Sequence, residues 1–162
     1  MDVAVAVDDA RAGDVQALLA THLAFSREVT PPGHVHALAA PGLLDPAVTV
    51  VAARHDGHLV GMGALRRLDD RHAEIKSMHV TTAARGHGVG RAVLGHLLAL
   101  AAEGGYRRVS LETGTMAAFA PARTLYASAG FVPCAPFGEY SATPHSTCMT
   151  IALGTAGAGG GP

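Results

Sequence analysis

The sequence predicts an α/β protein with one mixed, mostly antiparallel sheet of about seven strands and helices on both faces. Strand-like and helix-like segments follow one another in the order β-α-α-β-β-β-α-β-α-β-β. Three consecutive strands joined by short turns indicate an antiparallel meander. The third of these strands leads through a glycine-rich turn into a long apolar helix, and such a crossover requires the next strand to be parallel.

Size and composition fit a single domain over residues 1–153, followed by a flexible glycine-rich tail at 154–162. An apolar content of 49% excludes overall disorder, and a net charge of −1 gives no reason to expect nucleic acid or a membrane as a partner. No apolar run approaches a membrane span, and the acidic N-terminus is unlike a signal peptide. Cys134 and Cys148 are therefore expected as free thiols in a cytoplasmic protein.

The N-terminal part reads as a strand and two helices. Residues 2–7 alternate as a short strand, and Asp14 is a possible N-cap for a helical stripe that runs to about Glu28. The breaker Pro31-Pro32-Gly33 then separates this helix from a short second helix, predicted from His34 to about Ala40.

A β-hairpin is predicted next. The strand 47–54 and its partner 58–68 flank Asp56-Gly57, which is a strong hairpin signal. Gly61 and Gly63 lie inside the second strand, where glycine indicates a bulge or a close approach of another backbone.

The stretch 74–103 is the organising segment of the chain. A strand over 73–80 leads into the turn 85–91 and then into the apolar helix. The first N–H groups of a helix lack internal partners, and glycines let a ligand approach the backbone closely, so this turn is a candidate anion site. Its glycine spacing is not that of a dinucleotide fingerprint, and it lacks the lysine of a P-loop.

The C-terminal part completes the sheet after Gly104-Gly105 ends the long helix. The predicted elements are a strand over 107–113, a loop over 114–119, a helix from Pro121 to about Ser128, a strand over 131–136, a loop over 141–146 and a last strand over 147–153.

Two motifs in this order of elements resemble the GNAT family of N-acetyltransferases. They are Arg85-x-x-Gly88-x-Gly90 in the turn and Leu125-Tyr126-x-x-x-Gly130-Phe131 in the last helix. Ser110-Leu-Glu-Thr-Gly, Pro121-Ala-Arg, Cys134-x-Pro-Phe and Met149-Thr are similar to a small bacterial single-domain branch of the family. The resemblance covers roughly residues 2–153 and implies a GNAT fold whose central strands, here 74–80 and 108–113, splay apart.

The resemblance implies acetyl-CoA as co-substrate, with its thioester in the gap between these strands. The implied pyrophosphate contacts are Arg85, Gly86, His87, Gly88, Val89, Gly90 and Arg91. Backbone groups of Met78, His79 and Val80 are implied to receive the acetyl carbonyl and the pantetheine arm. Many members carry an Asn where this chain has Phe119, so that contact is not carried over.

Acetyl transfer to an amine needs a group that removes a proton, and it benefits from an acid at the leaving thiolate. Several family members place a glutamate where Glu74 stands, which makes Glu74 the candidate base, acting directly or through a water. Glu112 is the rival base or a contact for a substrate cation. Tyr126 is the candidate acid by resemblance, with a packed core tyrosine as the alternative. His36 is a candidate substrate contact.

The function expected from these residues is acetyl-CoA-dependent N-acetylation of a small-molecule or amino-acid-like amine. Segments 31–46 and 136–146 are expected to form pocket walls, which favours a small acceptor. The alternatives are acetylation of a protein lysine or N-terminus, and a non-catalytic acyl-CoA-binding regulatory module. The histidines lack metal-ligand spacing, so no metal is expected. Both a monomer and a homodimer stay open.

Overall fold

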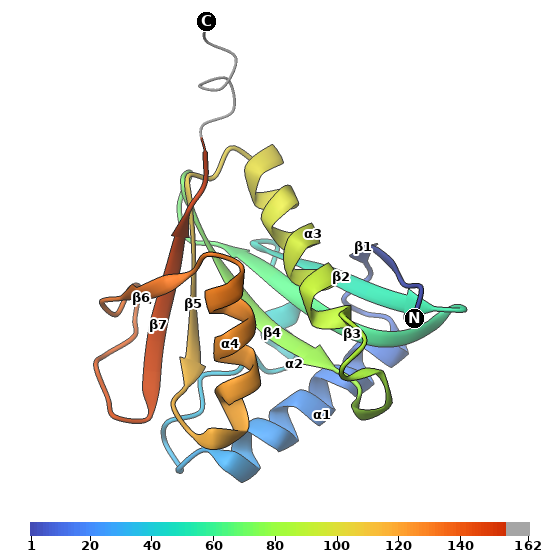
Figure 1. The fold of residues 1–162 in the computed structure, drawn as a ribbon, viewed down its shortest axis with the longest axis horizontal. Coiled ribbons are helices and arrows are strands. Elements are labelled where there is room, and N and C mark those ends of the chain that lie inside the picture. Colours follow the sequence, from blue (N-terminus) through green and yellow to red (C-terminus); the bar gives the residue numbers. More distant parts are fainter. Residues whose placement is uncertain (155–162) are drawn as a thin grey trace, which may run out of the picture.

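The structure, a computed structural model, describes residues 1–154 and contains a seven-stranded mixed sheet with helices on both faces (Figure 1). The strands are β1 (Ala4–Asp8), β2 (Val48–His55), β3 (His58–Arg67), β4 (His72–Val80), β5 (Arg108–Gly114), β6 (Val132–Cys134) and β7 (Ser146–Ala152). The helices are α1 (Gly13–Val29), α2 (Ala40–Leu43), α3 (Val89–Glu103) and α4 (Ala120–Ser128). The predicted fold class is confirmed. The tail predicted at 154–162 lies, apart from Gly154, outside the described residues.

The strand order is β1-β2-β3-β4-β5-β7-β6, with β4 and β5 parallel and the other neighbouring strands antiparallel. The crossover through α3 makes β4 and β5 parallel, as the sequence predicts. Helix α3 ends where expected, because Gly104 is its C-cap and Gly105 has a φ of 81°.

The predicted β2–β3 hairpin is confirmed, and so is the close approach predicted at a glycine of its second strand. Asp56 and Gly57 have φ values of 48° and 80°, the two positive values that a type I′ turn requires. A Cβ at Gly63 would lie 2.7 Å from the sulfur of Met78 and 2.8 Å from a methyl of Leu97. Glycine is therefore needed there because α3 packs closely on β3.

Two hydrophobic cores cover the two faces of the sheet. The larger core joins the sheet to α3 and α4, with Val93, Leu97 and Tyr126 among its buried members. The smaller core joins β2 and β3 to α1 and α2, around Leu19 and Leu43. These cores fix α1 and α4 on opposite faces of the sheet, near the place where β4 and β5 separate (Figure 1).

Two local predictions in the N-terminal part are wrong. Residues 34–39 form no helix, and the short α2 begins at Ala40, because Pro41 favours the first turn of a helix. Asp14 is not the N-cap of α1: Ala12 holds that position and makes no side-chain cap hydrogen bond.

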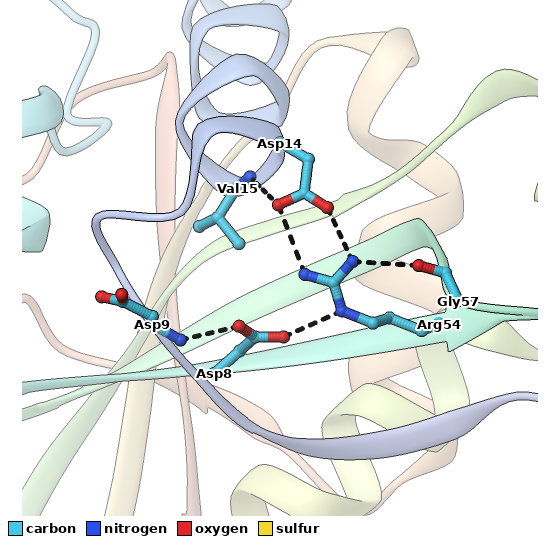
Figure 2. A network of polar contacts seen from close by, with 6 residues as sticks. All are labelled: Asp8, Asp9, Asp14, Val15, Arg54 and Gly57. Carbon is cyan, nitrogen blue, oxygen red and sulfur yellow. Dashed lines mark hydrogen bonds and ion pairs between the residues drawn. The ribbon is translucent and has the colours of Figure 1, made fainter.

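The carboxylate of Asp14 belongs instead to a polar network around Arg54 (Figure 2). The Arg54 guanidinium donates to Asp14 at 2.6 Å, to Asp8 at 3.0 Å and to the carbonyl of Gly57 at 3.3 Å. The hydrogen bond from Arg54 also holds the pKa of Asp14 below its usual value. The network ties the start of α1 to β1 and to the hairpin, which helps to set the position of the helix.

The remaining predicted strands are confirmed, although the strand predicted over 131–136 is reduced to β6, where prolines flank and interrupt it. Cys134 and Cys148 are both free thiols. None of the helices in residues 1–154 is long and apolar enough to cross a membrane.

Candidate active site

Strands β4 and β5 are paired at one end and separate at the other (Figure 1). Their register runs only from His72↔Arg108 to Ile75↔Leu111. Beyond that point β4 continues along β3, while β5 continues along β7 to Gly114. We call the paired part the closed end of the β4–β5 pair and the separated part its open end. The predicted splay of the central strands is present.

A cavity of about 100 Å³ lies at the open end. Its walls come from α1 (His22, Ser26), the segment 34–37, β4 (Lys76, Ser77, Met78), β5 (Glu112, Thr113, Gly114) and α4 (Ala122, Tyr126). The lining is completed by Thr30, Ile75, Phe119 and His145. The ring of Phe119 packs edge-on against Phe25, with ring centroids 5.5 Å apart. An aromatic packing contact therefore takes the place of the Asn that many family members carry at this position.

Glu112 lines this cavity from β5. Its carboxylate accepts a hydrogen bond of 2.8 Å from the hydroxyl of Ser146. Burial raises the pKa of Glu112 above the usual value for a glutamate, although the Ser146 hydrogen bond opposes the shift. A half-buried carboxylate with a raised pKa is suited to accept a proton inside the cavity.

Glu74 lies at the closed end and does not line the cavity. Its side chain is buried with a residue exposure of 2%, and its carboxylate accepts hydrogen bonds from the Lys76 ammonium at 3.2 Å and from the hydroxyl of Tyr140. Lys76 also donates to the hydroxyl of Tyr140 at 2.7 Å. Burial, followed by the charge of Glu74, raises the pKa of Tyr140. The Glu74 carboxylate is thus already paired within the protein.

Tyr126 combines a packed ring with a place on the cavity wall. The ring lies edge-on to Phe131, with centroids 5.9 Å apart, and only 6% of the residue is exposed. Burial and then the charge of Glu112 raise the pKa of the phenol. The hydroxyl therefore keeps its proton and can donate a hydrogen bond into the cavity.

The turn before α3 carries a row of free amides. Gly86 and Gly88 both have a φ of 79°, and the first helical hydrogen bond runs from Ala92 N–H to the carbonyl of Gly88 at 3.0 Å. Within residues 1–154 the amides of 86–91 have no backbone partner. Exposed guanidinium groups of Arg85 and Arg91 flank the turn. Such a turn can hold a phosphate or pyrophosphate.

The three residues that end β4 lie beyond its pairing with β5. Met78 and Val80 pack into the larger core, whereas His79 lies on the opposite face with its Nδ1 3.1 Å from Nδ1 of His22. Burial lowers the pKa of His79 and lowers that of His22 to about 4. Both imidazoles are therefore neutral near pH 7, with one donating to the other.

His36 lies at the rim of the cavity, and its exposed ring is edge-on to Tyr140, with centroids 5.3 Å apart. The site also contains residues that the sequence did not single out, namely His22, Lys76, Ser77 and Tyr140. The strand alternation that puts Lys76 beside Glu74 was a usable signal, because residues two apart share a face. Tyr140 reaches the site from a loop, for which the sequence offers no comparable rule.

Residues 1–154 contain no group of three or more His, Cys, Asp or Glu side chains placed to hold a metal ion. The rings of His34 and His145 pack edge-on, with centroids 4.7 Å apart, at the cavity wall.

Residues 15–131 match the family model "Acetyltransferase (GNAT) family". The uncharacterised N-acetyltransferase YsnE of Bacillus subtilis is 42% identical over 149 residues, which is 92% of this chain and 99% of that protein. A proposed acyl-CoA N-acyltransferase from Klebsiella pneumoniae has the same fold, with a TM-score of 0.78, 24% identity, and coverage of 93% of this chain and 97% of that one. A GNAT family acetyltransferase from Elizabethkingia anophelis, solved with acetyl-CoA bound, gives a TM-score of 0.67 at 17% identity, covering 93% and 98% of the two chains.

Proposed function

Because this chain belongs to the acetyltransferase (GNAT) family and is an acyltransferase, we propose that it transfers the acetyl group of acetyl-CoA to a small-molecule or amino-acid-like amine. In the proposed reaction the amine attacks the thioester directly. The N–C bond forms, the C–S bond breaks and CoA leaves. An ammonium acceptor gives up two protons in total, of which one ends on the CoA thiol and one goes to solvent.

The observation that carries this proposal is the open end of the β4–β5 pair beside the free amides of 86–91. The amides and the flanking Arg85 and Arg91 would hold the pyrophosphate. The free edge of residues 78–80 would receive the pantetheine arm, and the thioester would enter the cavity. The Elizabethkingia relative with acetyl-CoA bound has the same fold, which supports this assignment.

Glu112 is a better candidate for the proton-accepting base than Glu74. Glu112 lines the cavity and has a raised pKa, whereas the Glu74 carboxylate is engaged by Lys76 and Tyr140. A base with a pKa closer to neutrality is more effective at neutral pH. Glu74 stays the alternative, acting through Lys76 or a water.

Tyr126 would donate its phenolic proton to the thiolate as the C–S bond breaks. Its buried ring fixes the hydroxyl at the cavity wall, and its raised pKa keeps the proton in place until a thiolate forms. The proton that Tyr126 gives up would return from solvent.

The acceptor side of the cavity supports a small amine rather than a protein segment. Residues 34–37 and His145, which come from the two segments expected to form pocket walls, enclose it together with α1. His36 and Glu112 are the candidate acceptor contacts on this side. Acetylation of a protein lysine or N-terminus would require these walls to leave an open groove.

The test is acetyl-CoA turnover with a panel of small amines and amino acids, followed as CoA release and confirmed by mass of the acetylated product. Transfer to one or more members of the panel is the expected result. If acetyl-CoA binds and only lysine-containing peptides are acetylated, the acceptor assignment is wrong. If neither CoA nor acetyl-CoA binds, the whole proposal is wrong.

The pyrophosphate assignment has a matched pair of glycine variants at the two ends of α3. Gly88 and Gly105 have φ values of 79° and 81°, and neither would bring a Cβ within 4 Å of another group. Alanine therefore costs similar strain at both, but only Gly88 stands in the proposed site. Gly88→Ala should weaken CoA binding by about tenfold, whereas Gly105→Ala should leave it unchanged. Equal CoA affinities in calorimetry would refute the assignment.

A further inference from the structure

Ser77 has an unusual backbone conformation for its place in the chain. Its φ is 58°, in the left-handed region that favours glycine. Within residues 1–154 the other non-glycine with a positive φ is Asp56, which lies in the hairpin turn where such a conformation is expected. Ser77 lies instead in the middle of β4. Strain of this kind persists only where the surrounding structure enforces it, and it occurs often at functional sites.

A bulge in β4 accounts for this conformation. The register with β3 runs from Met62↔His79 to Ala64↔Lys76, so Ser77 and Met78 together stand opposite the single residue Gly63. A bulge re-aims the side chains on the bulged strand. It begins two residues after Ile75, where the pairing with β5 ends. The bulge therefore re-aims Ser77 at the start of the open end.

The hydroxyl of Ser77 is buried without a hydrogen-bond partner. The residue is 6% exposed. Among the buried side-chain oxygen and nitrogen atoms of residues 1–154, the Oγ of Ser77 is the one without a hydrogen-bond partner. An unpaired buried hydroxyl costs folding free energy, so its persistence needs an explanation. Ser77 lines the cavity that also contains Glu112 and Tyr126. The missing partner can thus be a ligand atom in that cavity.

We propose that the Ser77 hydroxyl donates a hydrogen bond to the carbonyl oxygen of the acetyl thioester. This inference rests on the proposed function. Glu112 projects into the cavity from β5 and would attract the proton-bearing acceptor. The acceptor then approaches from the β5 side, and the thioester carbonyl lies against β4, where the unpaired Ser77 hydroxyl adds a side-chain donor to the backbone groups of residues 78–80.

The chemistry of acyl transfer explains why a donor belongs there. When the amine attacks, the N–C bond forms and an electron pair of the C=O bond moves onto oxygen. The C=O bond is restored as the C–S bond breaks and the thiolate leaves. The Ser77 proton stays on its own oxygen throughout and stabilises the transient oxyanion. The strained backbone holds the hydroxyl in place before the substrate arrives, and the substrate supplies its missing partner.

Binding measurements with two ligands isolate this contact, because CoA lacks the acetyl group that acetyl-CoA carries. Calorimetry on Ser77→Ala should give an unchanged affinity for CoA and an affinity for acetyl-CoA lowered by about three- to tenfold. Equal effects on both ligands, or no effect on either, would overturn the proposal.

Kinetics and stability provide a second readout with the amine acceptor that the panel identifies. Ser77→Ala should lower kcat by about ten- to a hundredfold, because the interaction strengthens in the transition state. Its Tm should stay level or rise, because an unpaired buried hydroxyl is removed. Ser77→Gly also relieves the strain at positive φ, so it should be more stable still while losing kcat equally. If Ser77→Ala keeps kcat, or changes only KM for the acceptor, the proposal is wrong.

Ser110 offers a matched control on the neighbouring strand. It is buried like Ser77, but its hydroxyl is hydrogen-bonded to His72 at 2.6 Å and to Thr150 at 2.9 Å, at the closed end. Ser110→Ala should therefore lower Tm and keep kcat, the reverse of Ser77→Ala. A wild-type protein that neither binds nor uses acetyl-CoA would refute the proposed function. A wild-type protein that does both, together with a fully active Ser77→Ala, would refute only the role of Ser77.

Discussion

The closed and open ends of the β4–β5 pair contain the same kinds of residue but differ in how their polar groups are paired. At the closed end, Ser110 bonds to His72 and Thr150, and Glu74 bonds to Lys76 and Tyr140. At the open end, the Ser77 hydroxyl is unpaired, and Glu112 accepts a hydrogen bond from Ser146 while it lines the cavity. The two ends are joined by continuous strands, so the difference is one of hydrogen-bond satisfaction and not of composition.

This difference predicts which polar groups are structural and which are functional. A buried polar group must find a partner, and at the closed end the partners belong to the chain itself. At the open end the separated strands leave hydroxyl, carboxylate and amide groups facing a cavity and a glycine turn. We therefore expect substitutions at the closed end to change stability, and substitutions at the open end to change binding and rate.

The largest expected effect distinguishes the two glutamates. Glu112→Gln keeps the size of the side chain but cannot take a proton, so turnover at neutral pH should fall by about 10²- to 10³-fold. In the wild-type protein, turnover should decline as the pH falls through the pKa of Glu112, which is raised by burial, at a pH above that typical of glutamate. This acid limb should be lost in the variant. A pH–rate profile of both proteins checks the prediction. If Glu74→Gln shows this phenotype instead, the roles of the two carboxylates are exchanged.

Substitutions at the closed end should change the stability of the protein. Glu74→Gln leaves the buried Lys76 ammonium without its counter-charge, which should lower the free energy of unfolding by about 3 kcal/mol in denaturant titrations. Adding Lys76→Met removes the other partner, so the double variant should recover much of the loss. A stable Glu74→Gln protein with strongly reduced turnover would contradict the division between the two ends.

Tyr126, on helix α4 beside the open end, provides another test of the difference between the two ends. Tyr126→Phe keeps the ring packed against Phe131 and removes only the hydroxyl, so turnover should fall by about ten- to a hundredfold while acetyl-CoA affinity and Tm change little. Steady-state kinetics and thermal melting measure these quantities. Full activity would make Tyr126 a core residue like Phe131.

The smallest effect is expected far from both ends, in the Arg54 network. Asp14→Asn removes one charge from a partly exposed ion pair, with the Asp14 side chain 47% exposed, so Tm should drop only slightly. Because the Asp14 pKa lies below its usual value, the stability from this pair is present near neutrality and is lost as the pH falls through that pKa. Melting curves near pH 7 and at acidic pH check this. A large loss of turnover would show that the position of α1 controls the cavity more strongly than we infer.

The sequence predicted what depends on neighbouring residues. Asp56-Gly57 specifies a hairpin because its φ values are set locally, and the glycine turn with the following helix leaves free amides because these arise from the helix start itself. The parallel direction of β5 relative to β4 followed from the crossover through α3. The local errors, a helix over 34–40 and a cap at Asp14, occurred where a proline and a distant arginine outweighed local preference.

Only the tertiary structure decided which polar groups are paired. Glu74 and Glu112 both stand on central strands in the sequence, but Tyr140 and Lys76 engage the first, and the separation of β4 from β5 opens a cavity to the second. The bulge at Ser77 likewise exists because β3 places Gly63 opposite two residues of β4. Register, strand separation and loop contacts join residues far apart in the chain, so no local pattern specifies them. The sequence by itself determined the family and a candidate phosphate-binding turn, and packing between distant segments determined which carboxylate and which hydroxyl line the cavity.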